Sequence, residues 1–191
     1  MHHVFNMPTP TRFVVLDRDG TVIVERNYLS DPDQVELLPN AIEGLRAMRS
    51  LGLGLVIVTN QSGIGRGYFD EARLSRIHER LHGMLQEADL TVDGVYYCPH
   101  TPDDDCACRK PRPGLIEQAA QDLHFRPADC VVIGDKACDI QLGQRVGATT
   151  ILVRTGYGEQ ELKKLDPPPD AVVADLAEAA AFLAPSPGRG V

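Results

Sequence analysis

The ten residues RFVVLDRDGT, residues 12–21, join a short apolar run to a cluster of charged and hydroxyl side chains. The run at 12–16 is rich in β-branched and aromatic residues, which favours a buried strand. The polar cluster follows directly, beginning with Asp17, Arg18 and Asp19. An Asp-x-Asp pair on its own fits a turn or a helix cap as well as it fits a functional site. The rest of the chain decides between these interpretations.

Two kinds of apolar segment alternate along the chain. Short continuous runs predict buried strands at 12–16, 53–58, 92–97, 130–133, 150–153 and 171–173. Apolar residues at helical spacing predict the intervening helices. These lie at 39–51, from Asp70 to about 85, from Pro113 to 123, from just after the 130–133 strand to about 146, and at 176–183. Strands that alternate with helices and are apolar throughout are typical of a mostly parallel sheet. The sequence therefore predicts an α/β fold, a three-layer Rossmann-like sheet with helices on both faces.

The length of the chain, 191 residues, suits one domain with a full hydrophobic core. We expect a single domain over 1–191, with flexible tails at 1–11 and 185–191. No internal repeat or low-complexity segment divides it.

Composition and charge exclude several classes of protein. Hydrophobic residues make up 43% and charged residues 24%, the balance of a globular protein. The net charge of -8 argues against general binding to nucleic acid or to an anionic membrane. No apolar stretch approaches the length of a transmembrane helix, and the N-terminus lacks the pattern of a signal peptide. Because the cysteines are clustered as in a metal site, we expect a reducing compartment, the cytoplasm.

Polar clusters follow four of the predicted strands. Asp17 and Asp19 follow the first, Thr59 follows the second, Lys110 lies beyond the third, and Asp135 follows the fourth. Carboxyl ends of parallel strands share one edge of a sheet, where such folds bind ligands. Four clusters in this order are much stronger evidence for a site than one Asp-x-Asp pair.

These clusters resemble the four motifs of the haloacid dehalogenase (HAD) superfamily of phosphatases: DRDGT, TN, RKP and GDxxxD. The wider set DRDGT, TNQSGIGRGYF, CPH…CxCRKPRPG, GDK and VRTGYG is similar to its family of D-glycero-D-manno-heptose 1,7-bisphosphate 7-phosphatases. The resemblance implies a Mg²⁺-dependent phosphatase for a small anionic sugar phosphate. It also implies a capless fold, and no interval between the motifs is long enough to hold a large cap domain.

Each motif residue then has a chemical reason. Asp17 is the expected nucleophile, forming an aspartyl-phosphate, and Asp19 is the expected general acid and base. Asp17, Asp135 and the main-chain carbonyl of Asp19 offer a hard, all-oxygen site suited to Mg²⁺.

The remaining motif residues are expected to act on the phosphoryl group or around it. Thr59 can donate a hydrogen bond to a phosphoryl oxygen, and Lys110 can counter the charge of the transition state. Asp139 would share a helical face with Asp135 if a helix began there. We expect it to orient Lys110 or a metal-bound water rather than to bind the metal.

The loop at 98–108 contains three of the five cysteines and one histidine. The set Cys98, His100, Cys106 and Cys108 has the composition of a closed tetrahedral Zn²⁺ site. Four protein ligands leave no open position, so the zinc is expected to be structural and to fix the approach of the next two residues. The alternatives are ordinary packing cysteines or a disulfide between Cys106 and Cys108. The two other cysteines, at 130 and 138, are expected to be packing residues.

A further set of residues is predicted to bind the substrate. Arg109 suits a second anionic group or the sugar, and the others follow from their places in the resembling motifs: Arg18, Glu25, Arg26, Asn27, Tyr28, Asn60, Gln61, Ser62 and Lys136. A solvated turn is an equal alternative for 25–28, and a surface lysine is an alternative for Lys136.

Other functions remain open from the sequence. Histidinol-phosphate phosphatases, which resemble this family in motifs and zinc loop, and other small sugar-phosphate phosphatases are the enzymatic alternatives. A non-enzymatic zinc-loop module is disfavoured because it would not need Asp17, Asp19, Lys110 and Asp135 together. A phosphatase for nucleic-acid ends is disfavoured by the negative charge. The preferred heptose anomer and pathway are left open, and we expect a monomer.

Overall fold

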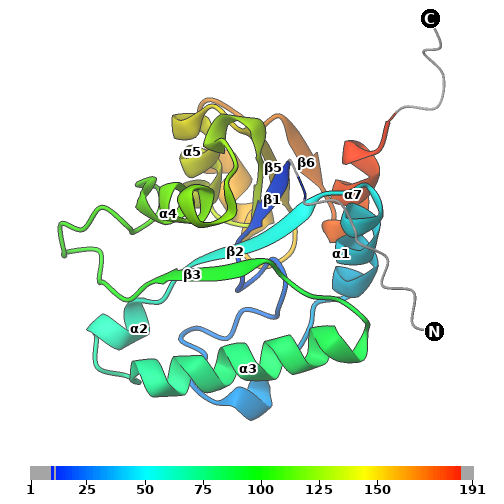
Figure 1. The fold of residues 1–191 in the computed structure, drawn as a ribbon. Helices are drawn as coiled ribbons and strands as arrows, with labels where there is room; N and C mark the ends of the chain where they lie inside the picture. Colours follow the sequence, from blue (N-terminus) through cyan, green and yellow to red (C-terminus); the bar gives the residue numbers. More distant parts are fainter. Residues whose placement is uncertain (1–9, 11, 186–191) are drawn as a thin grey trace, which may run out of the picture.

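The computed structural model describes residue 10 and residues 12–185 (Figure 1). Apart from Pro10 and Pro185, the tails predicted to be flexible lie outside the described residues. The described chain forms a six-stranded sheet in the order β3-β2-β1-β4-β5-β6, and every neighbouring pair is parallel. The strands are β1 Phe13–Leu16, β2 Gly54–Asn60, β3 Gly94–Cys98, β4 Val131–Gly134, β5 Thr149–Val153 and β6 Ala171–Val173. The predicted parallel α/β sheet is confirmed.

The longer helices lie where the apolar spacing predicts them. They are α1 Ala41–Ser50, α3 Glu71–Glu87, α4 Gly114–Leu123, α5 Ala137–Val146 and α7 Leu176–Leu183. Asp70 caps α3 by accepting a hydrogen bond from the Arg73 amide at 2.8 Å. The sequence missed the short helices because three or four residues give no apolar period: α2 Ser62–Gly65, α6 Gly158–Glu161, and the 3₁₀ helices η1 Pro32–Gln34, η2 Pro127–Asp129 and η3 Leu162–Lys164.

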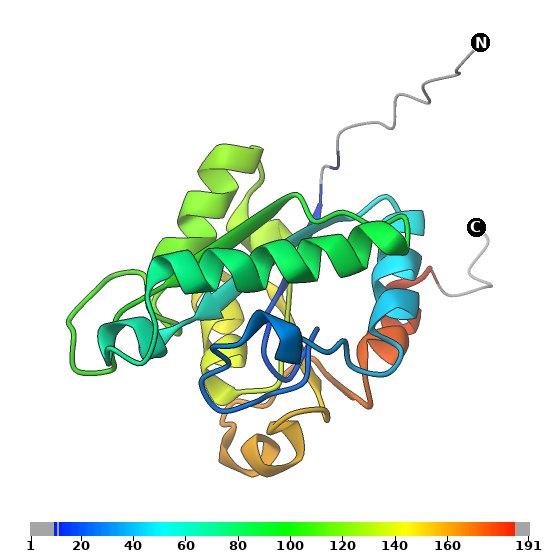
Figure 2. The same ribbon diagram turned by 90° about the horizontal axis from the view of Figure 1, so that it is seen from below.

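Alternate residues of each strand enter two separate cores. On β1, Val14 and Leu16 join a core with residues of α1, α3 and α7, such as Leu45 and Ile77. Phe13 and Val15 join the other core, with residues of α4 and α5. This alternation produces the three predicted layers, with α3 lying across one face of the sheet (Figures 1 and 2).

The middle of the sheet sets the position of the site. β1 pairs with β2 on one side and with β4 on the other. Strands β2 and β3 are added on one side of β1 and strands β4 to β6 on the other, so the strand order reverses at β1. The Asp17 amide, just past β1, donates to the Ile133 carbonyl of β4 at 2.9 Å. Residues that follow β1, β2 and β4 therefore meet at the switch point, where open α/β sheets bind ligands.

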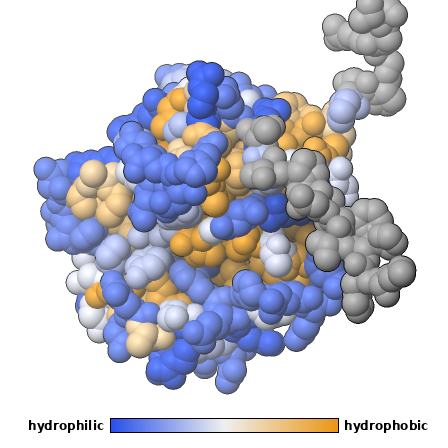
Figure 3. Space-filling model, in the orientation of Figure 1, coloured by the Kyte–Doolittle hydropathy of each residue, from blue (hydrophilic) through white to orange (hydrophobic). Residues whose placement is uncertain are grey.

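Most of the surface seen in Figure 3 is hydrophilic, with hydrophobic residues in the hollow between β3 and α3. Within the described part of the chain, no helix is long and apolar enough to cross a membrane.

Candidate active site

A cleft of about 280 Å³ opens at the carboxyl ends of β1 and β2. All four residues predicted to be catalytic line it: Asp17, Asp19, Thr59 and Lys110. Each is less than a tenth exposed. The convergence expected from parallel strand ends is present.

Lys110 is the fixed positive charge of the cleft. Its Nζ lies 2.7 Å from Asp17 Oδ1 and 2.7 Å from Asp139 Oδ1, and it donates to the Val58 carbonyl at 2.7 Å. Burial alone would lower the pKa of Lys110, but the Asp139 and Asp17 carboxylates raise it above its usual value. The ammonium is therefore charged and held by three oxygen atoms before any substrate arrives.

Asp139 makes the predicted contact with Lys110, but the helix argument that placed it was wrong. Helix α5 begins at Ala137, so Asp135 precedes the helix and shares no helical face with Asp139. Asp139 Oδ2 accepts a hydrogen bond from the Lys136 amide at 3.0 Å. One carboxylate thus caps α5 and anchors Lys110.

Asp135 is fully buried and forms no ion pair among the described residues. Its carboxylate lies in a group with those of Asp17 and Asp139, with one oxygen of each within 4.8 Å of the others. The Asp135 Oδ2 accepts from the Tyr157 amide at 2.8 Å, whereas the buried Oδ1 has no hydrogen-bond partner among the described residues. Burial, followed by the charges of Asp17 and Asp139, raises the pKa of Asp135 to about 8. A cation held by these hard oxygens would lower that pKa and engage the free Oδ1, which fits Mg²⁺.

Two glycines let the backbone close around Asp135. A Cβ on Gly20 or on Gly156 would lie 2.2 Å from Asp135 Oδ2, and both glycines have positive φ, +86° and +55°. Thr155 Oγ1 donates to the Gly20 carbonyl at 2.6 Å and ties the two loops together. Only glycine leaves room for the carboxylate at these two positions.

We expect Gly156→Ala to lower Mg²⁺-dependent phosphatase activity at least about tenfold, because the added methyl displaces Asp135 from the metal position. Activity measured against Mg²⁺ concentration should show a raised half-saturating concentration. Gly83→Ala is the matched control, since a Cβ there meets nothing within 4 Å. Wild-type Mg²⁺ dependence in Gly156→Ala would contradict the close packing around Asp135.

Asp19 is held by two neighbours. Arg18 donates from Nε to Asp19 Oδ2 and from Nη2 to Oδ1, both at 3.0 Å, and Gln61 Nε2 donates to Oδ2 at 3.0 Å. Burial would raise the pKa of Asp19, but Arg18 and Gln61 hold it below the usual value. In this arrangement Asp19 is a carboxylate with a fixed orientation.

Arg18 and Gln61 line the cleft, as predicted for residues that bind the substrate, and both also contact catalytic groups. Arg18 is 1% exposed and its guanidinium is engaged by Asp19 and His78. Gln61 is also buried, and Nε2 donates to Asp19 and to Thr59 Oγ1, the latter at 2.8 Å. Both side chains orient catalytic groups and also form part of the wall of the cleft.

The structure corrects one prediction of substrate binding, that of Arg26. It does not line the cleft; its Nε donates to the Gln34 carbonyl at 3.1 Å, and it forms an ion pair with Glu36. The residues around it explain the error. Asn27 and Tyr28 have positive φ, 47° and 70°, and the chain bends there in a way the sequence pattern does not reveal.

The other residues predicted to bind substrate do line the cleft: Glu25, Asn27, Tyr28, Asn60, Ser62, Arg109 and Lys136. Lys136 Nζ lies 2.6 Å from Glu25 Oε2, so its charge is partly balanced. Asn60 accepts from the Lys110 amide at 3.0 Å and donates to the Lys110 carbonyl at 3.2 Å, which fixes the catalytic loop.

The sequence reasoning missed Tyr157 and Cys138 as cleft residues. The Lys136 ammonium lies 5.0 Å from the centroid of the Tyr157 ring. The signal for Tyr157 was its place just after the strand ending at Val153, where the same strand-end argument applies. Cys138, expected to be a packing residue, lies within the GDxxxD motif, whose position should have been given more weight.

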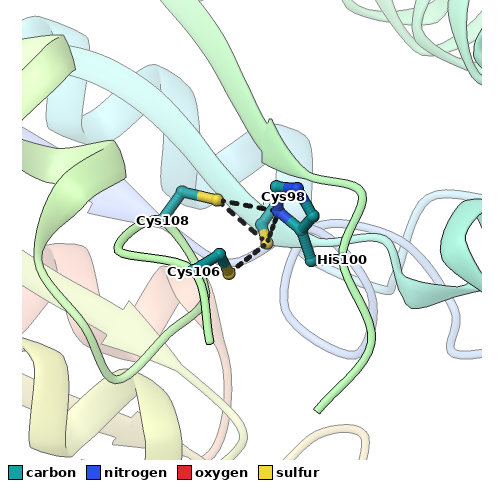
Figure 4. A group of neighbouring side chains, drawn as sticks. All are labelled: Cys98, His100, Cys106 and Cys108. Atoms are coloured by element: carbon teal, nitrogen blue, oxygen red, sulfur yellow. Dashed lines mark hydrogen bonds between the residues drawn. The ribbon is translucent and has the colours of Figure 1, made fainter. Parts of the chain in front are cut away.

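The four predicted zinc ligands converge in one cluster (Figure 4). Cys98 Sγ lies 3.7 Å from Cys106 Sγ, 3.2 Å from Cys108 Sγ and 3.5 Å from His100 Nδ1. Ligands on a tetrahedral zinc with 2.3 Å bonds are about 3.8 Å apart, so the cluster needs little movement to bind the ion. All five cysteines are free, which leaves the disulfide alternative without support.

We expect Cys108→Ser to lose bound zinc and to lower the melting temperature, because metal binding and the folding of the 98–108 loop are coupled. Zinc per chain and thermal unfolding measure both effects. Cys130→Ala, outside the cluster, is the control and should retain zinc. A Cys108→Ser protein without zinc but with wild-type stability and substrate affinity would exclude a structural metal.

Comparisons with known proteins agree with this geometry. A family model described as HAD-hydrolase-like matches residues 107–179. D-glycero-beta-D-manno-heptose-1,7-bisphosphate 7-phosphatases are similar relatives. The Haemophilus influenzae enzyme is 40% identical over 152 residues, covering 75% of this chain and 82% of its own length. The Bordetella bronchiseptica enzyme is 36% identical over 174 residues, covering 90% and 97%.

Solved structures give the same result. The D,D-heptose 1,7-bisphosphate phosphatase of B. bronchiseptica, complexed with magnesium and phosphate, matches with a TM-score of 0.84 and 35% identity. The match covers 90% of this chain and 97% of that one. The corresponding enzyme of Burkholderia thailandensis matches with a TM-score of 0.71 and 33% identity, covering 91% and 99%.

Proposed function

Because the chain belongs to the HAD-superfamily family of D-glycero-D-manno-heptose 1,7-bisphosphate 7-phosphatases, we propose that it hydrolyses the 7-phosphate of that sugar bisphosphate. One observation carries the proposal: Asp17, Asp19, Thr59 and Lys110 share one cleft, and the Asp17 carboxylate is grouped with that of Asp135, whose buried Oδ1 has no hydrogen-bond partner in the part of the chain that the structure describes. This is the set of groups that a phosphoryl transfer through an aspartyl-phosphate requires.

The reaction runs in two steps on this chain's own residues. An Asp17 oxygen forms a bond to phosphorus while the bond from phosphorus to the sugar O7 breaks. Asp19 donates a proton to the leaving O7. Water then attacks the aspartyl-phosphate, Asp19 accepts its proton, and inorganic phosphate leaves with Asp17 restored. The anionic phosphate beside Asp19 raises the pKa of that carboxyl, which favours the protonated form needed in the first step.

Lys110 and Thr59 supply positive charge and a hydroxyl donor to the phosphoryl oxygens. When bound by Asp17, Asp135 and the Asp19 carbonyl, Mg²⁺ neutralises the phosphoryl charge. Zinc in the Cys98–His100–Cys106–Cys108 cluster has a structural role in the proposal, since all four ligand positions are filled by the protein.

We further propose that the protein acts as a monomer in the cytoplasm. The groups that the proposed reaction uses, Asp17, Asp19, Thr59 and Lys110, all belong to one chain, so the reaction needs no residue of a second copy. Three free thiols in one loop are stable in a reducing compartment, which supports the cytoplasm.

A panel of phosphate esters tests the function: both anomers of the heptose bisphosphate, histidinol phosphate and an aryl phosphate, each with Mg²⁺ and after chelation. We expect one heptose anomer to give the highest kcat/KM and chelation to stop the release of phosphate. Preference for histidinol phosphate would replace the substrate, and no Mg²⁺-dependent release from any ester would refute the enzyme.

We expect Arg109→Ala to lower kcat/KM for the heptose bisphosphate by about 2–4 kcal/mol, or about 30- to 1,000-fold, because an anionic group of the substrate loses its charged partner. Arg109 lines the cleft, and its Nη1 donates to the His100 carbonyl at 3.2 Å. An aryl phosphate has no distal group, so its kcat/KM should change little.

Arg112→Ala is the matched control, since Arg112 lies in the same loop but does not line the cleft. Equal losses on the two substrates for Arg109→Ala would assign the arginine to catalysis or loop folding.

A further inference from the structure

The side chain of Arg18 connects Asp19 to helix α3. Nε and Nη2 of the guanidinium face the Asp19 carboxylate, while Nη1 lies 3.0 Å from His78 Nε2 on α3. Arg18 is 1% exposed, so water does not replace either contact. His78 is therefore linked to Asp19 by hydrogen bonds through a single residue, Arg18.

The chemistry of the two groups fixes the direction of this hydrogen bond. A guanidinium has donors and no acceptor, so His78 Nε2 must be the acceptor and the ring proton must be on Nδ1. Burial, followed by the charge of Arg18, lowers the pKa of His78 to about 4. The imidazole is neutral in the ordinary physiological range, as an acceptor for Arg18 has to be.

Packing alone does not account for His78. One side of the ring faces a cavity of about 500 Å³ between α3 and the sheet, the hollow seen in Figure 3. Its ring centroid is 6.1 Å from that of Tyr97. With open space beside the ring, the hydrogen bond to Arg18 is what orients it.

We propose that His78 is a positioning residue for Asp19, the acid and base of the proposed reaction, and that it acts by holding the guanidinium of Arg18 in place. Without an acceptor at Nη1, a buried N–H is left unsatisfied. The guanidinium then turns to satisfy it and moves the Asp19 carboxylate that it grips by two hydrogen bonds.

The test uses the demand of the leaving group for a proton. A sugar oxygen is a poor leaving group and needs Asp19, whereas p-nitrophenolate leaves without protonation. Since kcat/KM reports the steps up to cleavage of the ester, it isolates the acid role of Asp19.

We expect His78→Leu to lower kcat/KM for the heptose bisphosphate by about 10- to 100-fold. This is less than the full rate acceleration that a general acid supplies, because Asp19 itself remains. For p-nitrophenyl phosphate the change should stay within about twofold. His78→Gln, which keeps an acceptor at a similar reach, should recover most of the loss.

His82→Leu is the matched control, because His82 lines the same cavity and should keep the wild-type ratio of the two substrates. Equal losses on both substrates in His78→Leu, or a glutamine variant no better than leucine, would overturn the proposal. Wild-type protein inactive on both esters would remove the proposed function and this role with it. Active wild-type protein with an unchanged ratio in His78→Leu would remove the role of His78 alone.

A measurement on the wild-type protein covers the case in which His78→Leu does not fold. Nitrogen NMR of the ring should show a neutral imidazole protonated on Nδ1 from about pH 5.5 to 8. A ring that becomes charged in that range, or that carries its proton on Nε2, would overturn the proposal.

Discussion

Asp17→Asn is expected to abolish turnover, lowering kcat at least about a thousandfold on every ester, because the amide is a poor nucleophile and a weaker metal ligand. The substitution also removes one of three clustered negative charges. Loss of the Asp17 charge relieves its repulsion of Asp135 but also weakens its ion pair with Lys110, so the melting temperature without Mg²⁺ should stay close to that of wild type. Steady-state assays and thermal unfolding measure the two effects.

Zinc content should be unchanged in Asp17→Asn, because the cluster lies outside the nucleophile's contacts. Asp103→Asn, at an exposed carboxylate of the zinc loop, is the control and should keep full activity. Substantial multiple turnover by Asp17→Asn would exclude an aspartyl-phosphate on this residue.

Lys110→Met is the second substitution with a large expected effect, on both rate and stability. Its loss leaves Asp17, Asp139 and the Val58 carbonyl without their buried donor. We expect the free energy of unfolding to fall by about 3–5 kcal/mol, the usual result of removing one partner from a buried ion pair. The rate should fall about a hundredfold or more on sugar and aryl phosphates alike, because the transition-state charge is common to both.

Urea unfolding and kcat on the two substrates measure these losses. Adding Asp139→Asn to Lys110→Met should restore part of the stability, since it removes an unpaired charge, but should not restore the rate. Lys164→Ala, at an exposed lysine, is the control. A loss for sugar phosphates alone would mean that Lys110 recognises substrate instead of stabilising the transition state.

The sequence predicted the fold and the centre of the site for a clear physical reason. Buried parallel strands are apolar throughout, so the places where polarity returns mark their ends. Asp17, Thr59 and Asp135 were found in this way, without knowledge of the strand order. The cluster of Cys98, His100, Cys106 and Cys108 was predicted because these side-chain types have few other uses at that spacing, and the structure brings the four together.

What the sequence did not reveal are the contacts of long side chains and the effect of local turns. Arg18 was predicted from its motif only as a substrate-binding residue; it lines the cleft, but its guanidinium also reaches Asp19 and His78, contacts that the motif does not reveal. Arg26 turns away where Asn27 and Tyr28 adopt positive φ. His78 was also missed, because a histidine next to the apolar positions of α3 looks like an ordinary surface residue of the helix. Its hydrogen bond to Arg18 is seen only in the structure.

The wide sequence separation of the site residues has a consequence for how the protein folds. Lys110 and Asp17 are 93 residues apart, and the contact between Thr155 and Gly20 spans 135 residues. Non-local contacts close late, because the loop entropy must be lost before they stabilise the chain. The phosphate site can then form only when nearly the whole sheet is in place, so recovery of catalytic activity during refolding reports the completed native topology. Earlier, partly folded forms of the chain carry the same aspartates but are not phosphatases.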